Sequence, residues 1–333
     1  MRVAFLALPL AALSVGGAGC GQQSSSTVTV SVPQTTAGAA AEQPRHAVNG
    51  RPSGRASATP SPEAPAPAVR RPVGPAVTVP RQAGSGWSVA ATVSGQPAAW
   101  IAQRDGVTLM RFDQGLLRLD LHAGSAEPAG GGWSYESEIS RREIHRLVAA
   151  FNGGFRLSYG SVGFMADGRV GVPLTSGLGS IVTYQDGGTE IGAWRQGVPA
   201  RARRVASVLQ DLSLLVDRSA AAATVESCAI GCWGSTLGGV VNVARSALGI
   251  AGDGRLLWAA GESLSPAALA QALIAAGAQR AVELDINPEW VAGYLYVHHG
   301  SGPVAVPVVP GQAGIPGQLL SPYSRDFFTI VAR

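Results

Sequence analysis

The sequence predicts an α+β fold, in which a mixed, mostly antiparallel sheet or sheets carry a few packed helices. Short apolar runs of strand length recur between turns, and only two segments have the start signals of a helix. No repeat of fixed period is present. Many strands with few helices favour helices packed on one side of a mainly antiparallel sheet.

The predicted strands are apolar runs bounded by turn residues. They are residues 116–123, 149–155, 180–187, 213–217, 246–261, 281–286 and 326–332. The longest of these runs is interrupted by Ala-Gly-Asp-Gly at 251–254, a sequence typical of a hairpin turn. We therefore expect it to form two neighbouring strands.

Two helices are predicted from their ends. A capping box at 140–143 precedes apolar residues that continue at helical spacing through 147–148. The second helix covers 266–276, with Ser265 as N-cap, proline at its first position and Gly277 as its terminator. Each helix leads into a predicted strand.

Composition divides the chain into three regions. Residues 1–20 are similar to a lipoprotein signal peptide, with an apolar run too short to span a bilayer that leads to Cys20 as the lipidated residue. Gly17 departs from the usual lipobox, so cleavage and simple secretion is the alternative. Residues 21–84, rich in Pro, Ser and Ala, predict a disordered tether, and residues 85–333 a folded domain. We expect an exported protein, lipid-anchored to the outer face of the cell membrane or else secreted.

The distribution of positive charge argues against nucleic acid as a ligand, and the spacing of the cysteines argues against a metal site. The net charge of +4 arises from arginine without any lysine, and the basic cluster at 201–204 has no aromatic residues within it. Nucleic acid is therefore not a predicted partner. Cys228 and Cys232 are predicted to form a disulfide, since no second Cys or His pair lies nearby to complete a metal site. Neither a metal nor a cofactor is predicted.

The segment Ala-Val-Glu-Leu-Asp-Ile-Asn-Pro-Glu-Trp at 281–290 contains the strongest candidates for chemistry, since no common hydrolase motif is present. Glu283 and Asp285 are two apart in a predicted strand and so share a face. A pair of carboxylates is what glycosidases commonly use. Alternatively, Glu283 forms a structural ion pair with Arg280 or Arg325, and Glu138 is another candidate second acid.

Other polar residues stand where the backbone is unusual. Asn152 and Gly153 follow a strand and either approach a ligand closely or merely shape a turn. Arg245 begins an apolar strand, where it is either a structural ion-pair member or an anion binder. Trp290 offers a flat apolar face that suits a sugar ring.

Several of these segments, in this order, resemble the phosphodiester glycosidase family, whose mammalian member removes N-acetylglucosamine from mannose 6-phosphate. They are Phe-Asn-Gly-Gly-Phe at 151–155 and the segments 163–170, 209–217, 244–257, 264–285 and 324–330, so that the resemblance covers roughly residues 145–333. It implies a cleft for a sugar joined through its anomeric carbon to phosphate. In that cleft Asp285 would be the catalytic carboxylate, Arg245 would hold the phosphodiester and Asn152 would orient the substrate.

The chain departs from the family after Asp285, where Ile-Asn-Pro-Glu-Trp replaces a glycine-rich turn and a serine. The resemblance implies an envelope-exposed hydrolase that cleaves a sugar 1-phosphodiester in a cell-surface glycan or glycoconjugate. The departure favours a rival, a non-catalytic lipoprotein that binds anionic glycans in the same cleft. A third reading is a structural lipoprotein. The expected partners are a phosphosugar or an anionic envelope glycan, together with the membrane through the lipid anchor.

Overall fold

The structure is a computed structural model that describes residues 74–80, 84, 86–160, 162–300 and 302–333. The predicted signal peptide, its Cys20 and most of the predicted tether lie outside the described residues. Strand β1 (Ala76–Val77) falls inside the stretch expected to be tether and pairs with β2 (Ser88–Val93). Among the described residues no helix has the length and apolar character needed to cross a membrane.

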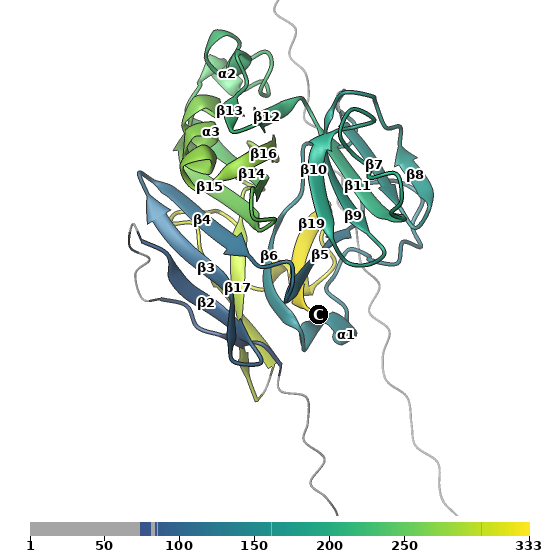
Figure 1. The fold of residues 1–333 in the computed structure, drawn as a ribbon, viewed down its shortest axis with the longest axis vertical. Coiled ribbons are helices and arrows are strands. Elements are labelled where there is room, and N and C mark those ends of the chain that lie inside the picture. The colour runs from purple at the N-terminus through teal and green to yellow at the C-terminus, as the bar shows by residue number, and fades with distance from the viewer. Residues whose placement is uncertain (1–73, 81–83, 85, 161, 301) are drawn as a thin grey trace, which may run out of the picture. The chain divides into compact units, whose positions relative to one another are not determined.

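Three sheets make up the folded part (Figure 1), and every pair of named strands in them is antiparallel. The first sheet has the order β1, β2, β3 (Gln96–Arg104), β4 (Val107–Phe112), β15 (Leu256–Leu264), β14 (Val243–Ala251), β16 (Ala278–Glu283), β12 (Leu214–Asp217), β13 (Ala220–Ala221). The second has the order β10 (Thr189–Ala193), β9 (Gly179–Tyr184), β11 (Val205–Asp211), β7 (Val162–Ala166), β8 (Arg169–Val172). The third has the order β18 (Gly302–Pro307), β17 (Gly293–His299), β6 (Leu147–Asn152), β19 (Phe327–Ala332), β5 (Leu117–His122).

Helices contribute little to this architecture. Those described are α1 (Arg141–Ile144), α2 (Thr224–Ser227) and α3 (Pro266–Ala275), with 3₁₀ turns at Leu237–Gly239 and Gln318–Leu320. The predicted α+β class, with helices packed on a mixed sheet, is therefore wrong, and the fold is β-rich. The capping box of the first predicted helix is present, but the helix ends after one turn because Leu147 and Val148 belong to β6. Only α3 is long enough to cover part of a sheet.

The local signals at α3 and at the hairpin are confirmed. Ser265 accepts a hydrogen bond from the amide of Ala268 as the N-cap of α3, Pro266 begins the helix, and Gly277 follows it with a φ of +99°. Strands β14 and β15 pair across the predicted turn at 251–254. Leu269 and Leu273 of α3 are fully buried in a cluster that includes Trp233.

The main core lies where the sheets face one another. Phe151 of β6 has its ring centroid 5.3 Å from that of Trp258 in β15 and 5.8 Å from that of Phe328 in β19. Phe164 of β7 and Leu209 of β11 belong to the same buried cluster. This one cluster contains side chains from all three sheets, so packing between strands forms the core that helices were expected to cover.

Candidate functional site

A pocket of about 710 Å³ opens where loops from all three sheets meet. Its lining comes from the loop after β6, the turn after β11, the loop after α2, the turn after β16 and the residues before β19. The lining residues are Phe155, Arg156, Tyr159, Gly160, Leu212, Gly231, Gly234, Ser235, Asp285, Ile286, Asn287, Glu289, Trp290 and Arg325. Acidic, basic and aromatic side chains therefore share one cavity.

Asp285 is the buried acid of this pocket, with 4% of its surface exposed. Its Oδ1 accepts hydrogen bonds from the backbone amides of Ile286 and Asn287, at 2.7 and 2.8 Å. Its Oδ2 accepts one from Nη2 of Arg325 at 3.1 Å. Burial raises the pKa of Asp285 above its usual value, although Arg325 and the two amides act in the opposite direction. The carboxylate is thus rigidly held at the pocket wall.

Arg325 provides the deep positive charge of the pocket. Its Nη2 also donates to the carbonyl of Gly154 at 2.8 Å, and its Nε lies 3.6 Å from Oε2 of Glu127. The guanidinium carbon lies 5.3 Å from the ring centroid of Trp290. Arg325 therefore joins the Gly-Gly turn after β6 to the turn after β16, and it stacks beside the pocket's largest aromatic face.

Arg245 and Glu283 lie behind the pocket and do not line it. Both side chains are fully buried, and Nη1 of Arg245 donates to Oε1 of Glu283 at 2.7 Å. The guanidinium also donates to the carbonyls of Trp233, Val241 and Leu264. Burial raises the pKa of Glu283 to about 7, against the effect of Arg245.

This geometry favours a structural ion pair for Arg245 over the alternative of a phosphate-binding residue. It also gives Glu283 a partner other than Arg280 or Arg325, the two that were considered from the sequence. Arg280 instead lies beside Asp217. Of the predicted pair of acids, only Asp285 reaches the pocket.

Asn152 and Gly153 shape the floor beneath the pocket rather than its lining. The side-chain amide of Asn152 donates to the carbonyl of Gly153 and to Oγ of Ser246, both at 2.8 Å, and accepts from the amide of Ala292. Both amide hydrogens and one lone pair of Oδ1 are thus engaged inside the protein. This favours the turn-shaping interpretation of Asn152.

The two glycines of the Gly-Gly turn are required by their acidic neighbours. A Cβ on Gly153 would overlap Oδ2 of Asp326, and one on Gly154 would overlap Oδ2 of Asp211. The amide of Gly154 donates to Asp326, and the amide of Phe155 donates to Asp211. Close approach of carboxylates, rather than of a ligand, accounts for these glycines.

Trp290 does line the pocket, as its predicted role in sugar stacking requires. Its ring meets that of Tyr323 edge-on, with centroids 6.0 Å apart. The exposed Glu289 brings a second carboxylate to the lining, whereas the exposed Glu138 is not among the lining residues. Two acids therefore reach the cavity, but the second is Glu289 and not Glu283.

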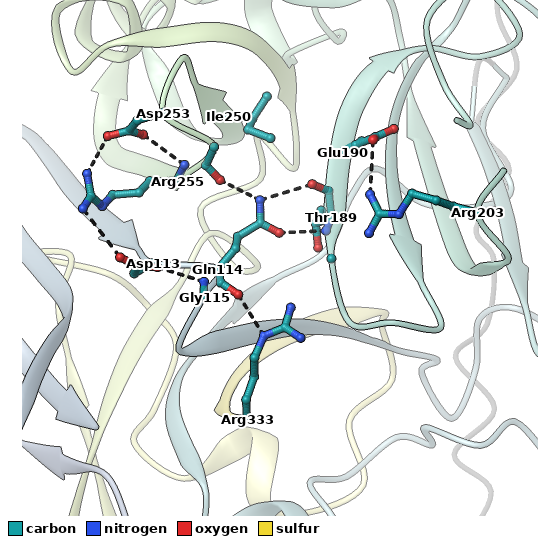
Figure 2. Close-up of a pocket in the computed structure, with 12 residues that line it drawn as sticks. Asp113, Gln114, Gly115, Thr189, Glu190, Arg203, Ile250, Asp253, Arg255 and Arg333 are labelled. Carbon is teal, nitrogen blue, oxygen red and sulfur yellow. Dashed lines mark hydrogen bonds and ion pairs between the residues drawn. The ribbon is translucent and has the colours of Figure 1, made fainter. Parts of the chain in front are cut away.

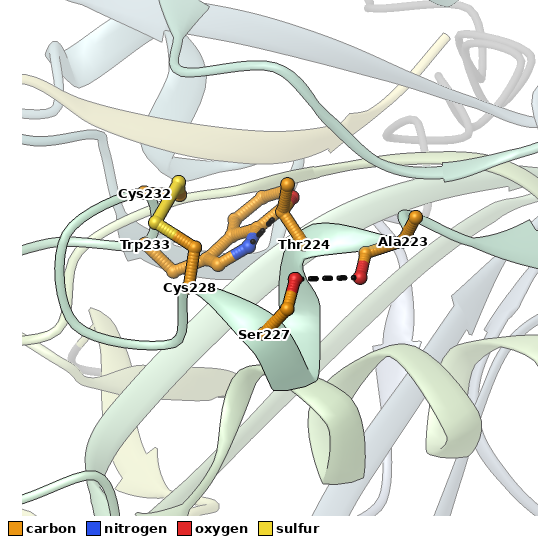
Figure 3. Close-up of a disulfide and its surroundings, with 6 residues drawn as sticks. All are labelled: Ala223, Thr224, Ser227, Cys228, Cys232 and Trp233. Atoms are coloured by element: carbon orange, nitrogen blue, oxygen red, sulfur yellow. Dashed lines mark hydrogen bonds between the residues drawn. A yellow bond between two sulfur atoms is a disulfide. The ribbon is translucent and has the colours of Figure 1, made fainter. Parts of the chain in front are cut away.

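The predicted disulfide is present, and Figure 3 shows Cys228 and Cys232 joined next to Trp233. The amide of Cys232 also donates to the carbonyl of Cys228, and Nε1 of the buried Trp233 donates to Oγ1 of Thr224. Gly231 and Gly234, on either side of Cys232 and Trp233, form one wall of the pocket. The disulfide therefore lies within the segment that forms this wall, and Gly234 packs closely against Ile286 of the turn that carries Asp285.

Replacing Cys228 and Cys232 together with serine is expected to destabilise the protein by about 2 kcal/mol, since the bond closes a short loop and constrains the unfolded chain. Thermal unfolding of the full-length protein with and without a thiol reductant measures this. The reductant should lower the melting temperature of the wild type and leave that of the double variant unchanged. Equal melting temperatures for both proteins without reductant would contradict the expectation.

A second cavity, of about 570 Å³, lies between the β4–β5 turn, the β9–β10 hairpin and the β14–β15 hairpin (Figure 2). Its three arginines are already engaged: Arg203 with Asp186 and Glu190, Arg255 with Asp113 and Asp253, and Arg333 with four backbone carbonyls. The side chain of Gln114 donates a hydrogen bond to the backbone carbonyl of Thr189 and accepts one from its backbone amide. It thereby satisfies the backbone groups that a neighbouring strand would otherwise pair with. This cavity is therefore interpreted as a junction between sheets.

Among the described residues, no three His, Cys, Asp or Glu side chains are grouped so that they could hold a metal ion. Three functional residues were missed from the sequence: Arg325 as a pocket residue, and Asp211 and Asp326 as its buried acids. Asp211 lies two residues before the predicted strand 213–217, and Asp326 is the first residue of the predicted strand 326–332. An acid beside a buried strand is the signal that could have found them.

Comparison with known proteins gave no family model and no curated protein that matches the chain. Among solved structures, the catalytic domain of zebrafish N-acetylglucosamine-1-phosphodiester alpha-N-acetylglucosaminidase, auto-inhibited by its pro-peptide, is similar over 75% of this chain and 86% of its own, at 14% identity and a TM-score of 0.46. A hypothetical protein from Synechocystis is similar over 73% of this chain and 63% of its own, at 13% identity and a TM-score of 0.38. A putative exported protein from Burkholderia pseudomallei is similar over 71% and 75%, at 13% identity and a TM-score of 0.30. Membership of the phosphodiester glycosidase family stays a prediction from the sequence.

Proposed function

We propose that the protein hydrolyses the anomeric C–O bond of a sugar 1-phosphodiester held in the 710 Å³ pocket. One observation carries this proposal: the buried carboxylate of Asp285, the guanidinium of Arg325 and the indole of Trp290 share a single lining. A carboxylate suits a developing oxocarbenium ion, a guanidinium suits a phosphodiester, and an indole suits a sugar face. The resemblance of the sequence segments supports the same substrate class.

Each lining group has a place in the proposed reaction. Asp285, fixed by three hydrogen bonds, stabilises or attacks the anomeric carbon as positive charge develops there. Glu289, on the exposed side of the lining, is the carboxylate that we assign to activating water. The phosphomonoester can leave without being protonated first, because its conjugate acid has a pKa of about 6, far below that of a sugar hydroxyl group. Arg325, with Arg156 at the rim, neutralises the departing phosphate.

The site is also proposed to work outside the cytoplasm, on an anionic glycan or glycoconjugate of the cell envelope. The disulfide beside the pocket supports this, since such bonds persist mainly in oxidising compartments. Anchoring through a lipid on Cys20, or simple secretion, remains the expectation from the sequence. A tether of several tens of residues would let the domain reach envelope glycans.

The test is incubation of the full-length protein with a panel of sugar 1-phosphodiesters, with mass spectrometry for the free sugar. Asp285→Asn keeps the size of the side chain and removes its charge, so we expect turnover to fall by a factor of about 10³ or more. Trp290→Ala should weaken substrate binding. Glu138→Gln, on the exposed surface away from the pocket, is the matched control and should leave turnover unchanged.

A second candidate function is binding of anionic glycans without hydrolysis. The three donors to the Asp285 carboxylate favour it, because a carboxylate held in this way is suited to fixing Arg325 in place. In that case no phosphosugar is cleaved, while calorimetry detects binding that survives Asp285→Asn and is lost in Arg325→Gln. Absence of both turnover and binding across the panel would reject both functions.

A further inference from the structure

Two aspartates lie directly behind the pocket, and neither is accounted for by the proposed reaction. Asp211 ends β11 and Asp326 precedes β19, with 0% and 2% of their surfaces exposed. Oδ1 of Asp211 accepts from the amide of Phe155 at 3.2 Å, and Oδ2 of Asp326 accepts from the amide of Gly154 at 2.9 Å. The remaining oxygen of each finds no hydrogen-bond partner among the described residues. A fully buried carboxylate with one unpaired oxygen is costly to keep charged.

The charges around these aspartates are already balanced without them. Arg325 contacts Asp285 and faces Glu127, which Arg156 approaches to 3.9 Å. Two guanidinium groups therefore match the two carboxylates of Asp285 and Glu127. Ionisation of both buried aspartates would leave the cluster with two uncompensated negative charges in a region closed to water.

The pKa directions agree with this geometry. Burial raises the pKa of Asp326 to about 7, and the nearby Asp285 adds to the effect although Arg325 opposes it. Burial likewise raises the pKa of Asp211 well above its usual range, and the neighbouring Asp326 raises it further. Each acid makes ionisation of the others harder, as expected for carboxyl groups that share a site.

We propose that Asp211 and Asp326 are positioning residues that hold protons below neutral pH, so that the positive charge of Arg325 acts on Asp285 and on an anion in the pocket. The part of this that concerns the anion rests on the proposed function, whereas the proton-holding does not. When the pair ionises at higher pH, Arg325 is shared among more carboxylates. It then offers less positive charge to the pocket.

The consequence for stability has a definite sign. Because the pKa of Asp326 in the folded protein lies above that of the unfolded chain, its carboxyl contributes stability that is fully present below the unfolded value of about 4. That contribution is lost as the pH rises through about 7. The free energy of unfolding should therefore decrease from weakly acidic to weakly alkaline pH. Glu283, whose pKa is also raised to about 7, contributes to the same decrease.

The test is urea unfolding of the full-length wild type, Asp326→Asn and Asp211→Asn at a series of pH values from about 5 to 8.5, a range that brackets the titration. Asparagine mimics the protonated acid, so each variant should fold and should lose part of the pH slope, equivalent to up to about one proton. Asp253→Asn, in the exposed β14–β15 turn, is the control. Because its pKa is lowered, its replacement should leave the slope in this range unchanged.

A pH slope that is the same in wild type, Asp326→Asn and Asp211→Asn would overturn the proposal, since it would mean that both acids are ionised throughout. If a variant fails to fold, carbon-13 NMR of the wild-type carboxyl groups decides instead. Two aspartate signals that titrate near or above neutrality support the proposal, and their absence rejects it.

Turnover of a sugar phosphodiester provides a separate readout. In Asp326→Asn the alkaline loss of activity should move to higher pH, which a purely structural role would not produce. If the wild type cleaves no phosphodiester, the proposed function fails while the stability slope still decides whether the pair holds protons. The two failures can therefore be told apart.

Discussion

Arg245→Met is expected to destabilise the protein by about 3–5 kcal/mol, the usual cost of leaving a buried charge without its partner. Glu283 would then lie fully buried with no cation beside it, and the carbonyls of Trp233, Val241 and Leu264 would lose a donor. Urea unfolding of the full-length variant measures the loss. A change in the unfolding midpoint without a change in slope would show that stability, and not compactness, is affected.

The double variant Arg245→Met with Glu283→Leu is the matched control for this expectation. Removing both charges leaves an apolar contact, so most of the lost stability should return. Arg280→Met provides a surface comparison, because its ion pair with Asp217 is about two-fifths exposed and should be worth no more than about 1 kcal/mol. A double variant as unstable as Arg245→Met would show that the carbonyl hydrogen bonds, and not the charge of Glu283, dominate.

Gly154→Ala is the second change with a large expected effect, a loss of about 3 kcal/mol from overpacking. The added methyl group would overlap the carboxyl group of Asp211, which is buried and cannot move into solvent. The same displacement would disturb the carbonyl of Gly154 that receives the hydrogen bond from Arg325. The binding of phosphosugars should therefore weaken together with stability, and chemical unfolding with calorimetry measures both.

Gly160→Ala is the control for this glycine, because a Cβ at Gly160 meets nothing within 4 Å and lies in the same loop. Its effect on stability should stay within about 0.5 kcal/mol. Combining Gly154→Ala with Asp211→Ser, which makes room for the methyl group, should restore part of the loss. An alanine at position 154 tolerated as well as one at 160 would mean that the Asp211 side chain can move aside.

The elements that sequence patterns predicted well are those fixed by neighbouring residues. Ser265, Pro266 and Gly277 define α3 through local hydrogen bonds and backbone preference, and the turn at 251–254 defines its hairpin in the same way. The predicted α+β class was wrong in part because the capping box begins a helix of only one turn. The apolar residues that were expected to continue that helix belong to strand β6. Tertiary pairing overrode the local helical pattern there.

The site was only partly predictable, because several of its contacts join residues that are far apart in the sequence. Asp285 and Trp290 belong to one short segment, so their shared position followed from the sequence. Arg325 reaches Asp285 across 40 positions of the chain, and Arg245 reaches Glu283 across 38. Which arginine faces the pocket and which is buried behind it depends on how the strands are ordered in the sheets. Patterns within a segment do not contain that information.

The placement of the pocket residues on three sheets has a consequence for how folding and ligand binding are coupled. Phe155 belongs to the loop after β6 of the third sheet, Leu212 follows β11 of the second, and Asp285 lies in the turn after β16 of the first. No single sheet supplies the whole lining, so we expect a partly assembled chain to bind a ligand of this pocket far more weakly than the folded protein. A ligand at one hundred times its dissociation constant would therefore add about 2.7 kcal/mol to the stability of the three sheets as one cooperative unit. Protection of amide hydrogens from exchange should increase in strands far from the pocket as well as beside it.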